Sequence, residues 1–331
     1  MVCAMWQVLS PVATAGWTHD ALGNSRYHLR RAHQHGIALG FLDDAVLPLL
    51  VWAAMVSQIH PHCVLHECTP AFQESTLQQL LGPDFRVQSV VFSPCDLGIP
   101  SERQRRYSLC TYLPTIRQKL DLNTFNFSKY CFRTMTVDGN IYFMSSHEEL
   151  LKMKKTLWMR VNPGADAEDI DFNDIPWRQC LTDADRQRLE EHTTILEADF
   201  NGLGGTCGMV NIGQSTSFQN CITRVMPTLL RKGLIWRIVM VDDVEQAVKG
   251  SCIRVDVRRD RPLMPLEHLA VQGVPLPSDV NVPTEACNPL RAVLHGGHLG
   301  DADIRSLAGN AMHIAAVGSM IAFGLMTVSR R

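Results

Sequence analysis

Two segments in the first third of the chain combine residue types that can do chemistry. Glu67 stands in residues 66–70, and Arg103 and Arg105 stand in residues 98–107. A carboxylic acid can exchange a proton with a reacting group, and a guanidinium can hold an oxyanion or a phosphate. One residue separates the two arginines, so an extended backbone would send both side chains to the same side. We therefore expect one acid and two cations to act together.

The segments around these residues favour an α/β fold. Residues 43–59 begin with two aspartates and are then almost continuously apolar, which is typical of a buried helix. Residues 76–81 predict a short helix that ends at a Gly-Pro pair. Three apolar or alternating segments predict strands, namely residues 62–66, 86–92 and 107–112. Strands and helices at this spacing indicate an α/β sheet.

The middle of the chain has a different composition. Residues 123–226 hold aromatic and polar runs, acidic turns and a glycine-rich loop at 201–213, and they predict a second, less regular region. Helices are expected again at 265–272 and 301–307. Residues 311–328 are apolar and reach the lower length limit of a membrane span, but glycines and a histidine interrupt them. A buried terminal helix is our interpretation.

The charge balance gives no sign of a general affinity for nucleic acid. The chain has 33 acidic and 31 basic side chains and a formal net charge of −2, so contact with nucleic acid would depend on local basic clusters. Its 11 cysteines have no regular spacing, and no secretory signal opens the sequence. We expect reduced thiols and an intracellular protein that does not cross a membrane.

A metal site is an alternative interpretation of one histidine- and cysteine-rich stretch. The potential ligands are His60, His62, Cys63, His66 and Cys68. On a strand, His62 and His66 share a face but lie about 13 Å apart at ~3.3 Å per residue. That separation is too large for one ion unless the chain bends, so we expect no metal and keep zinc as the alternative.

Three parts of the chain, in this order, resemble cytosine-5 DNA methyltransferases. Residues 66–70 are similar to the family's Glu-Asn-Val-Pro segment through Glu67 and Pro70. Residues 98–107 are similar to its Gly-Val-Pro-Gln-x-Arg-x-Arg-x-Tyr/Phe segment, with Ser101 in the place of Gln. The second likeness is the more specific one, because five positions of the pattern match.

The third part lies near the C-terminus. Residues 261–275 resemble the family's Arg-x-Leu-Thr-x-x-Glu…Gln-Gly-Phe-Pro segment, and residues 309–312 resemble its closing Gly-Asn-Ser-Val/Met. Residues 227–229 stand where the family often has Pro-Thr-Leu. The resemblance therefore extends from about Glu67 to the C-terminus.

The resemblance also selects a cysteine. The family places a Pro-Cys pair some tens of residues before the glutamate, and Cys3, followed by Trp6, stands at a suitable distance. Cys95 follows Pro94 but comes after Glu67, so its position is wrong. The family's Phe-x-Gly-x-Gly loop for S-adenosylmethionine should precede the cysteine by roughly sixty to eighty residues. The chain therefore resembles an N-terminally truncated or divergent member.

The resemblance implies a Rossmann-like sheet of the S-adenosylmethionine-dependent methyltransferases, incomplete at the N-terminus, with an inserted target-recognition region. Residues 1–122 would form the partial catalytic domain, residues 123–226 the recognition region, and residues 227–331 a segment that returns to the catalytic domain. The recognition region would use basic and aromatic residues such as Tyr142, Phe143, Lys152, Lys154, Lys155 and Arg160.

The implied reaction moves a methyl group from S-adenosylmethionine to carbon 5 of a cytosine flipped out of DNA. Cys3 would add to carbon 6, Glu67 would act as the acid at ring nitrogen 3, and Arg103 and Arg105 would hold the base, the thiolate or a phosphate. Gly309 and Asn310 would close the far side of the cofactor pocket. A nuclear location is expected if the source is eukaryotic. The alternative is a catalytically inactive DNA-binding relic or partner subunit, which the absent cofactor motif favours.

Overall fold

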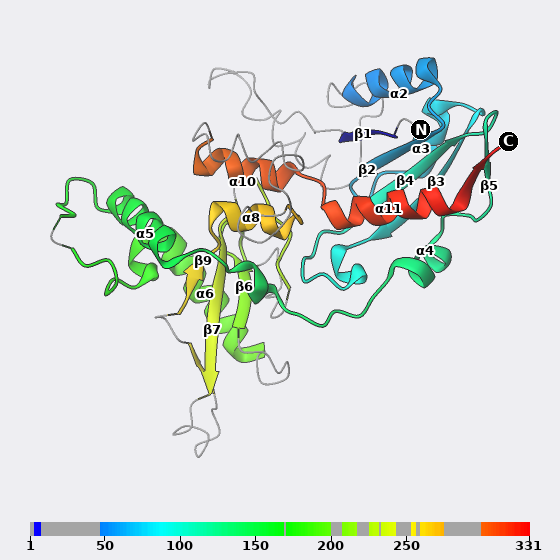
Figure 1. Cartoon of the computed structure of the whole chain (residues 1–331). Coiled ribbons are helices and arrows are strands. Elements are labelled where there is room, and N and C mark those ends of the chain that lie inside the picture. The colour runs from blue at the N-terminus through cyan, green and yellow to red at the C-terminus, as the bar shows by residue number, and fades with distance from the viewer. Residues whose placement is uncertain are drawn as a thin grey trace. The chain divides into compact units, whose positions relative to one another are not determined.

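The computed structural model describes residues 3–7, 47–168, 170–199, 207–216, 225–231, 233–242, 253–255, 259–274 and 299–331. The chain forms two compact units, whose elements are labelled in Figure 1. Unit 1 comprises Met1–Ser93, Gln104–Phe132 and Ala316–Arg331, and unit 2 comprises Pro94–Arg103 and Arg133–Ala315. The expected helix start at residues 43–46 lies outside the described residues, as does the loop at 201–206.

Unit 1 is built on a mixed sheet with the strand order β1-β2-β4-β3. β1 (Cys3–Gln7) runs parallel to β2 (Cys63–Cys68). β4 (Arg105–Tyr112) is antiparallel both to β2 and to β3 (Phe85–Phe92). β1, β2 and β3 therefore run in the same direction, and β4 is a reversed strand between two of them. The ends of β1, β2 and β3 and the start of β4 lie along one edge of the sheet.

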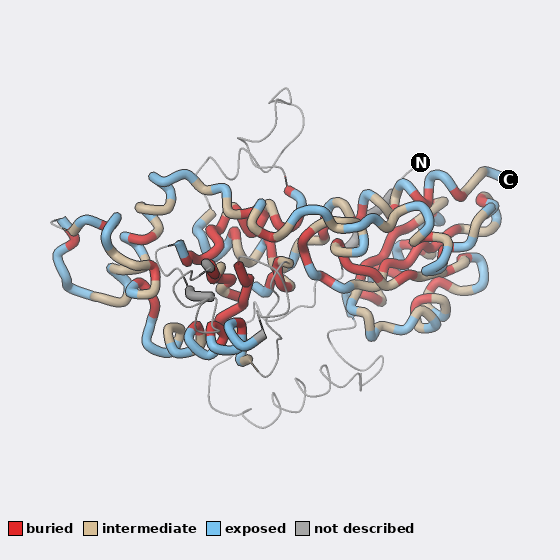
Figure 2. Tube along the Cα trace, turned by 90° about the horizontal axis from the view of Figure 1, so that it is seen from below, coloured by how far each residue is buried: buried red, intermediate tan, exposed pale blue. Residues whose placement is uncertain are grey.

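Helices cover both faces of this sheet, because strands buried on two sides need apolar partners on two sides. α2 (Leu47–Ile59) and α3 (Glu74–Leu81) share a buried cluster with Val87 of β3. On the opposite face, the Phe92 ring lies 4.8 Å from the Phe127 ring of α4 (Thr124–Cys131). Figure 2 marks the strands between these helices as mostly buried. The predicted α/β class is confirmed in this unit.

The apolar run at residues 311–328 contains the helix α11 (Ile314–Thr327), and the helix α10 (Asp301–Asn310) precedes it. α10 belongs to unit 2, and α11 belongs to unit 1. By length and composition alone, Asp301–Thr327 could cross a membrane. α11 has only 14 residues, fewer than the roughly 20 that a span needs, and its Met320 and Phe323 are fully buried. The predicted terminal helix is present, and one of its faces is buried. A short antiparallel pair joins the end of the chain to unit 1, between β5 (Ile116–Gln118) and β10 (Val328–Arg330).

Unit 2 contains a second sheet, centred on β7 (Ile235–Asp242). Three strands pair with β7 in the antiparallel sense, namely β6 (Cys207–Asn211), β8 (Ile253–Val255) and β9 (Arg261–Pro262). Among the described residues of unit 2, four helices accompany them, namely α5 (His147–Val161), α6 (Asp183–Asp199), α8 (Pro265–Val271) and α10. The described part of the unit also contains three single helical turns, η3 (Pro94–Leu97), η4 (Gly139–Tyr142) and η5 (Trp177–Cys180).

The structure divides the chain differently from the sequence-based boundaries at 122 and 226. Residues 133–226 and most of the expected returning segment fold together, because β7, from the latter, pairs with β6, from the former. The return to unit 1 occurs only at Ala316. The middle region also holds two long helices, and the expected glycine-rich loop at 201–213 contains the buried strand β6.

Replacing Phe323 by alanine should destabilise unit 1 strongly. The Phe323 ring is fully buried and lies 5.5 Å from the Phe127 ring, so truncation leaves a cavity under the sheet. We expect the free energy of unfolding to fall by about 3–5 kcal/mol in denaturant titrations. Met326 of the same helix is 62% exposed, and Met326→Ala should change the free energy by less than about 0.5 kcal/mol. Equal losses in both variants would contradict the placement of α11.

Candidate active site

Glu67 and Arg105 form an ion pair at the edge where the parallel strands of unit 1 end. Glu67 Oε1 lies 3.3 Å from Arg105 Nε, and the two side chains are 4% and 22% exposed. Glu67 is the next-to-last residue of β2, and Arg105 is the first residue of β4. Glu67 lies opposite Tyr107 in the ladder, so Arg105, two residues earlier on β4, faces the same side at a diagonal position. Open α/β sheets commonly bind their ligands at this edge.

Aromatic rings support this ion pair from the same face of the sheet. Tyr107 is fully buried, and its ring stacks on the Phe92 ring at a distance of 4.5 Å. Phe92 lies opposite Arg105 in the β3–β4 ladder. The polar pair therefore stands at the border of a packed apolar core, where water is largely excluded and charge–charge interactions are strong.

Residues of the opposite face hold the backbone around Glu67. Arg106 donates from Nε and Nη2 to the Pro70 carbonyl oxygen, at 3.3 and 3.0 Å. His66 is buried between the rings of Trp52 and Phe72, at centroid distances of 5.2 and 5.5 Å. Burial lowers the pKa of His66 to about 4, so the ring is neutral near pH 7. Pro70 and His66 thus fix the strand end from which Glu67 projects.

The strand register places Cys3 away from Glu67. Cys3 pairs with Cys63 at the start of β2, whereas the residue of β1 opposite Glu67 is Gln7. Four residues along a strand correspond to about 13 Å. The expectation that Cys3 and Glu67 meet around one base is therefore not met, because Cys3 begins its strand at the opposite edge of the sheet.

Cys68 lies next to Glu67 in the sequence but is poorly suited to replace Cys3. Its side chain points to the other face of β2, where its Sγ lies 3.9 Å from the Arg106 carbonyl oxygen. Burial, and then the charge of Glu67, raise the pKa of the Cys68 thiol to about 12. A thiol of this kind carries almost no thiolate at neutral pH, and the thiolate is the nucleophile.

Arg103 lies in unit 2 and does not share a strand with Arg105. β4 starts at Arg105, so the expected alternation of Arg103 and Arg105 on one extended strand is wrong. Arg103 is 3% exposed and donates from Nη1 to the Gly309 carbonyl oxygen at 3.4 Å. Gly98, which opens this segment, has φ of +83°, a conformation that glycine adopts without strain.

Hydrogen bonds with residues 226–228 hold the segment before Arg103 in place. Met226 donates its backbone N–H to the Pro100 carbonyl oxygen at 2.9 Å, and Glu102 donates to the Met226 carbonyl oxygen at 2.7 Å. The Thr228 hydroxyl donates to the Glu102 carbonyl oxygen at 2.8 Å. Two of the segments that carried the resemblance, far apart in sequence, are therefore neighbours in unit 2.

Gly309 has a packing role that the sequence did not reveal. A Cβ atom at this position would lie 2.6 Å from the Arg231 backbone nitrogen, so the last turn of α10 passes directly against the chain at Arg231. Asn310 is exposed at the end of the same helix. The cofactor role of both residues stays a prediction. Gly309 and Asn310 are the residues that the resemblance assigns to S-adenosylmethionine.

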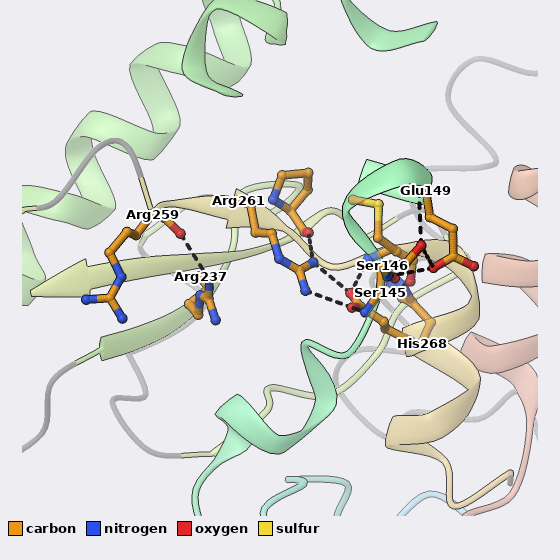
Figure 3. A network of polar contacts seen from close by, with 10 residues as sticks. Ser145, Ser146, Glu149, Arg237, Arg259, Arg261 and His268 are labelled. Atoms are coloured by element: carbon orange, nitrogen blue, oxygen red, sulfur yellow. Dashed lines mark hydrogen bonds and ion pairs between the residues drawn. The ribbon is translucent and has the colours of Figure 1, made fainter. Parts of the chain in front are cut away.

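A buried network joins three elements of unit 2 and was missed in the sequence (Figure 3). Arg261 donates from Nη1 and Nη2 to the two carboxylate oxygens of Glu267, at 2.9 and 2.8 Å. The same carboxylate accepts the backbone N–H of Met264 and of Ser145, each at 2.8 Å. Ser146 then caps α5 in a capping box with Glu149. Glu267 thus connects β9, α8 and the start of α5.

Aromatic residues expected to recognise nucleic acid instead hold this network in place. The guanidinium carbons of Arg237 and Arg261 each lie 4.5 Å from the centre of the Phe143 ring. Tyr142 is buried. Lys154 is also turned inward, with Nζ donating to the Phe172 carbonyl oxygen at 2.9 Å and lying 5.1 Å from the Trp177 ring centre. Three of the expected recognition residues are therefore structural.

The side chains of the histidine- and cysteine-rich stretch do not converge on one point. Among the described residues, no three His, Cys, Asp or Glu side chains are grouped to hold a metal ion. His62 Nδ1 lies 3.0 Å from the Thr115 hydroxyl, and His60 stacks on Tyr112 at 4.9 Å. These contacts occupy the two histidines in packing and hydrogen bonding.

Comparison with known proteins gives distant structural likeness only. No family model and no curated protein matches the chain. The Dnmt2 methyltransferase of S. pombe aligns at 14% identity over 85% of this chain and 71% of its own, with a TM-score of 0.38. The methyltransferase EhMeth of Entamoeba histolytica aligns at 11% identity over 85% of this chain and 68% of its own, with a TM-score of 0.39. A triple mutant of Spodoptera frugiperda DNMT2 aligns at 14% identity over 84% of this chain and 71% of its own, with a TM-score of 0.39. TM-scores of this size are too low to support a conclusion about fold or function.

Replacing Glu267 by glutamine should destabilise unit 2 and change its pH dependence. Burial raises the pKa of Glu267, but the hydrogen bonds and charge of Arg261, with the two backbone donors, outweigh it and lower the pKa overall. The stabilisation is therefore complete above the unfolded pKa and is lost as the pH falls through the folded value. We expect a loss of about 3–5 kcal/mol near pH 7, because Arg261 would be left buried without its counter-charge.

Denaturant titrations from about pH 7 to about pH 3 measure this effect. The wild-type stability should fall on acidification more steeply than that of Glu267→Gln. The control is Asp121→Asn, since Asp121 pairs with Arg86 at 3.0 Å but is 55% exposed, and its loss should cost less than about 1 kcal/mol. Parallel pH curves for wild type and Glu267→Gln would show that the carboxylate is not the titrating group.

Gly309→Ala and Gly318→Ala should have opposite effects on stability. Both glycines are helical, but a Cβ at Gly309 meets the backbone of Arg231, whereas a Cβ at Gly318 has nothing within 4 Å. We expect Gly309→Ala to lower the melting temperature and Gly318→Ala to add about 0.5–1 kcal/mol to the stability of α11. Calorimetric unfolding separates the two, and a neutral Gly309→Ala would contradict the close packing of α10.

Proposed function

We propose that this chain is a methyltransferase of the cytosine-5 type, acting on cytosine in DNA, with Glu67 and Arg105 as the residues that hold the base. The single observation that carries the proposal is the ion pair of these two side chains. It lies at the end of a parallel strand and is largely shielded from water. The resemblance of residues 66–70 and 98–107 to the family supports the same assignment.

The ion pair offers both kinds of hydrogen bond that the edge of cytosine needs. When protonated, the carboxyl group of Glu67 can donate to ring nitrogen 3 and accept from the exocyclic amino group, and Arg105 can donate to the carbonyl oxygen at carbon 2. Addition of a nucleophile at carbon 6 moves negative charge toward nitrogen 3 and oxygen 2, so these contacts become stronger as the reaction proceeds. Because both groups are largely enclosed, the target base would have to leave the duplex.

S-adenosylmethionine would supply the methyl group, and Asn310 is the residue assigned to its far side. The resemblance assigns to Cys3 the thiol that would add to carbon 6, but Cys3 begins its strand about 13 Å along the sheet from the level of Glu67. This register favours a second candidate function, in which the chain binds nucleic acid without transferring a methyl group and serves as a partner subunit.

Transfer of a labelled methyl group from S-adenosylmethionine to duplex DNA tests the first function. We expect Glu67→Gln to lower the rate at least about 100-fold, because the acid at ring nitrogen 3 is lost. The control Asp84→Asn removes a charge from an exposed side chain of the same unit and should change the rate less than about twofold. Activity retained in Glu67→Gln would overturn the assignment of the base-holding pair.

Two further measurements distinguish the candidate functions. Cys3→Ser should abolish transfer if Cys3 is the nucleophile and leave it unchanged if another thiol acts. Structured RNA, offered beside DNA, reports the class of nucleic acid. Binding of duplex DNA measured by fluorescence anisotropy, without transfer to either substrate and without S-adenosylmethionine binding in calorimetry, would establish the non-catalytic function instead.

A further inference from the structure

Unit 2 contains a cleft of about 540 Å³ that the proposed reaction does not use. This volume lies within the range of small-molecule sites, about 300–1,000 Å³. Its walls come from α5, α6, the turn before β7, the end of β9 and the N-terminal part of α10. All of these elements belong to unit 2, so the cleft is complete within one compact body.

The charged residues of the cleft are mainly arginines. Four arginines line it, namely Arg160, Arg188, Arg231 and Arg305, against two aspartates, Asp185 and Asp303. Both aspartates already have partners. Asp185 accepts from Arg188 at 3.0 Å, and Asp303 accepts the Gly300 backbone N–H at 3.1 Å at the start of α10. The cleft therefore has an excess of positive charge although the whole chain has a net charge of −2.

Arg160 and Arg305 are the two cations without a direct counter-charge. Among the described residues, neither guanidinium makes a hydrogen bond or an ion pair. Arg305 is partly buried, and burial lowers its pKa, with Asp301 opposing this effect and Arg160 adding to it. Two like charges that disfavour each other in this way would be stabilised by an anion between them. A bidentate guanidinium pair is well suited to a phosphate group.

Another part of the lining of the cleft is apolar. Met153 and Leu157 of α5 and Leu234 before β7 are only partly buried, and they pack against the hydrophobic cluster that contains Trp236. These side chains leave an apolar surface beside the two arginines. A ligand that fills the cleft would therefore combine a compact anion with a flat, apolar body.

We propose that this cleft binds one nucleotide unit, with its phosphate at Arg160 and Arg305 and its base against Met153, Leu157 and Leu234. Nucleotides combine the two chemistries in one small molecule, because a charged phosphate is attached to a base with an apolar face. The source is a free nucleotide or a nucleotide of a nucleic-acid strand. The choice of nucleic acid as a source rests on the proposed function, but binding in the cleft requires no catalysis at Glu67.

Binding of a fluorescein-labelled single-stranded 12-mer to the full chain tests the proposal by anisotropy. We expect the double variant Arg160→Gln and Arg305→Gln to weaken binding at least about tenfold. Its affinity should also depend less on salt, because each phosphate that the protein neutralises adds about 0.7 to the log–log slope. The matched control is Arg117→Gln with Lys119→Gln, which removes two charges from exposed side chains of unit 1 outside the cleft. It should change the affinity less than about twofold.

Two outcomes would overturn the proposal. Equal weakening in the two double variants would show a general electrostatic attraction in place of a site. Competition by inorganic phosphate as effective as by cytidine 5′-monophosphate would show that the apolar wall contributes nothing. If cytidine 5′-monophosphate displaces the 12-mer at an equal concentration, the natural ligand is a free nucleotide. If the 12-mer binds more tightly than the monophosphate, the natural ligand is a nucleotide of a nucleic-acid strand.

The test is independent of folding and of the methyl-transfer proposal. Removal of Arg305 relieves its repulsion with Arg160, so the double variant should melt at or above the wild-type temperature, and a loss of affinity then reports the cleft. Glu67→Gln should bind the 12-mer at the wild-type affinity. If transfer fails while the cleft arginines still control binding, the proposed reaction is wrong and the nucleotide site stands.

Discussion

The antiparallel pairing of β4 with both β2 and β3 is the constraint on which the candidate active site depends. Since β2 and β3 run in the same direction, the reversed strand starts at the edge where they end. Its first residue, Arg105, therefore comes to lie beside Glu67 of β2 at 3.3 Å. The same pairing places Tyr107 of β4 and Phe92 of β3 under the ion pair. β4 therefore supplies the cation and, with β3, the apolar support that strengthens its attraction to the carboxylate.

The Glu267–Arg261 pair of unit 2 and the Glu67–Arg105 pair of unit 1 are both largely enclosed, but they differ in what surrounds them. Glu267 accepts four hydrogen bonds, from Arg261, Met264 and Ser145, and its function is to join β9, α8 and α5. Glu67 lies at a strand end with Arg105 22% exposed. A fully satisfied pair in the interior stabilises one arrangement of the chain, whereas a pair at the edge of a sheet can accept a ligand.

The distribution of arginines gives unit 2 a cleft with excess positive charge, although the whole chain has a net charge of −2. Two of them are held over Phe143, and Arg261 is neutralised by Glu267. Arg160 and Arg305 remain in a cleft without a direct counter-charge among the described residues. The basic and aromatic residues of this region therefore serve two purposes, and only their contacts distinguish the structural ones, such as Lys154, from those available to an anion.

The sequence by itself determined α2, α3, β2, β3, β4 and the terminal helix α11, and it selected Glu67 and Arg105 as candidates, because apolar periodicity and short motifs are local properties. It did not determine β1 or α4. It did not determine β6, whose glycine-rich surroundings resembled a loop, or the division of the chain into two units, which depends on pairing between β6 and β7. It also placed Cys3 with Glu67 and Arg103 with Arg105. Only the tertiary structure separated them, because strand register and the start of β4 decide which side chains meet, and both are set by contacts between distant segments.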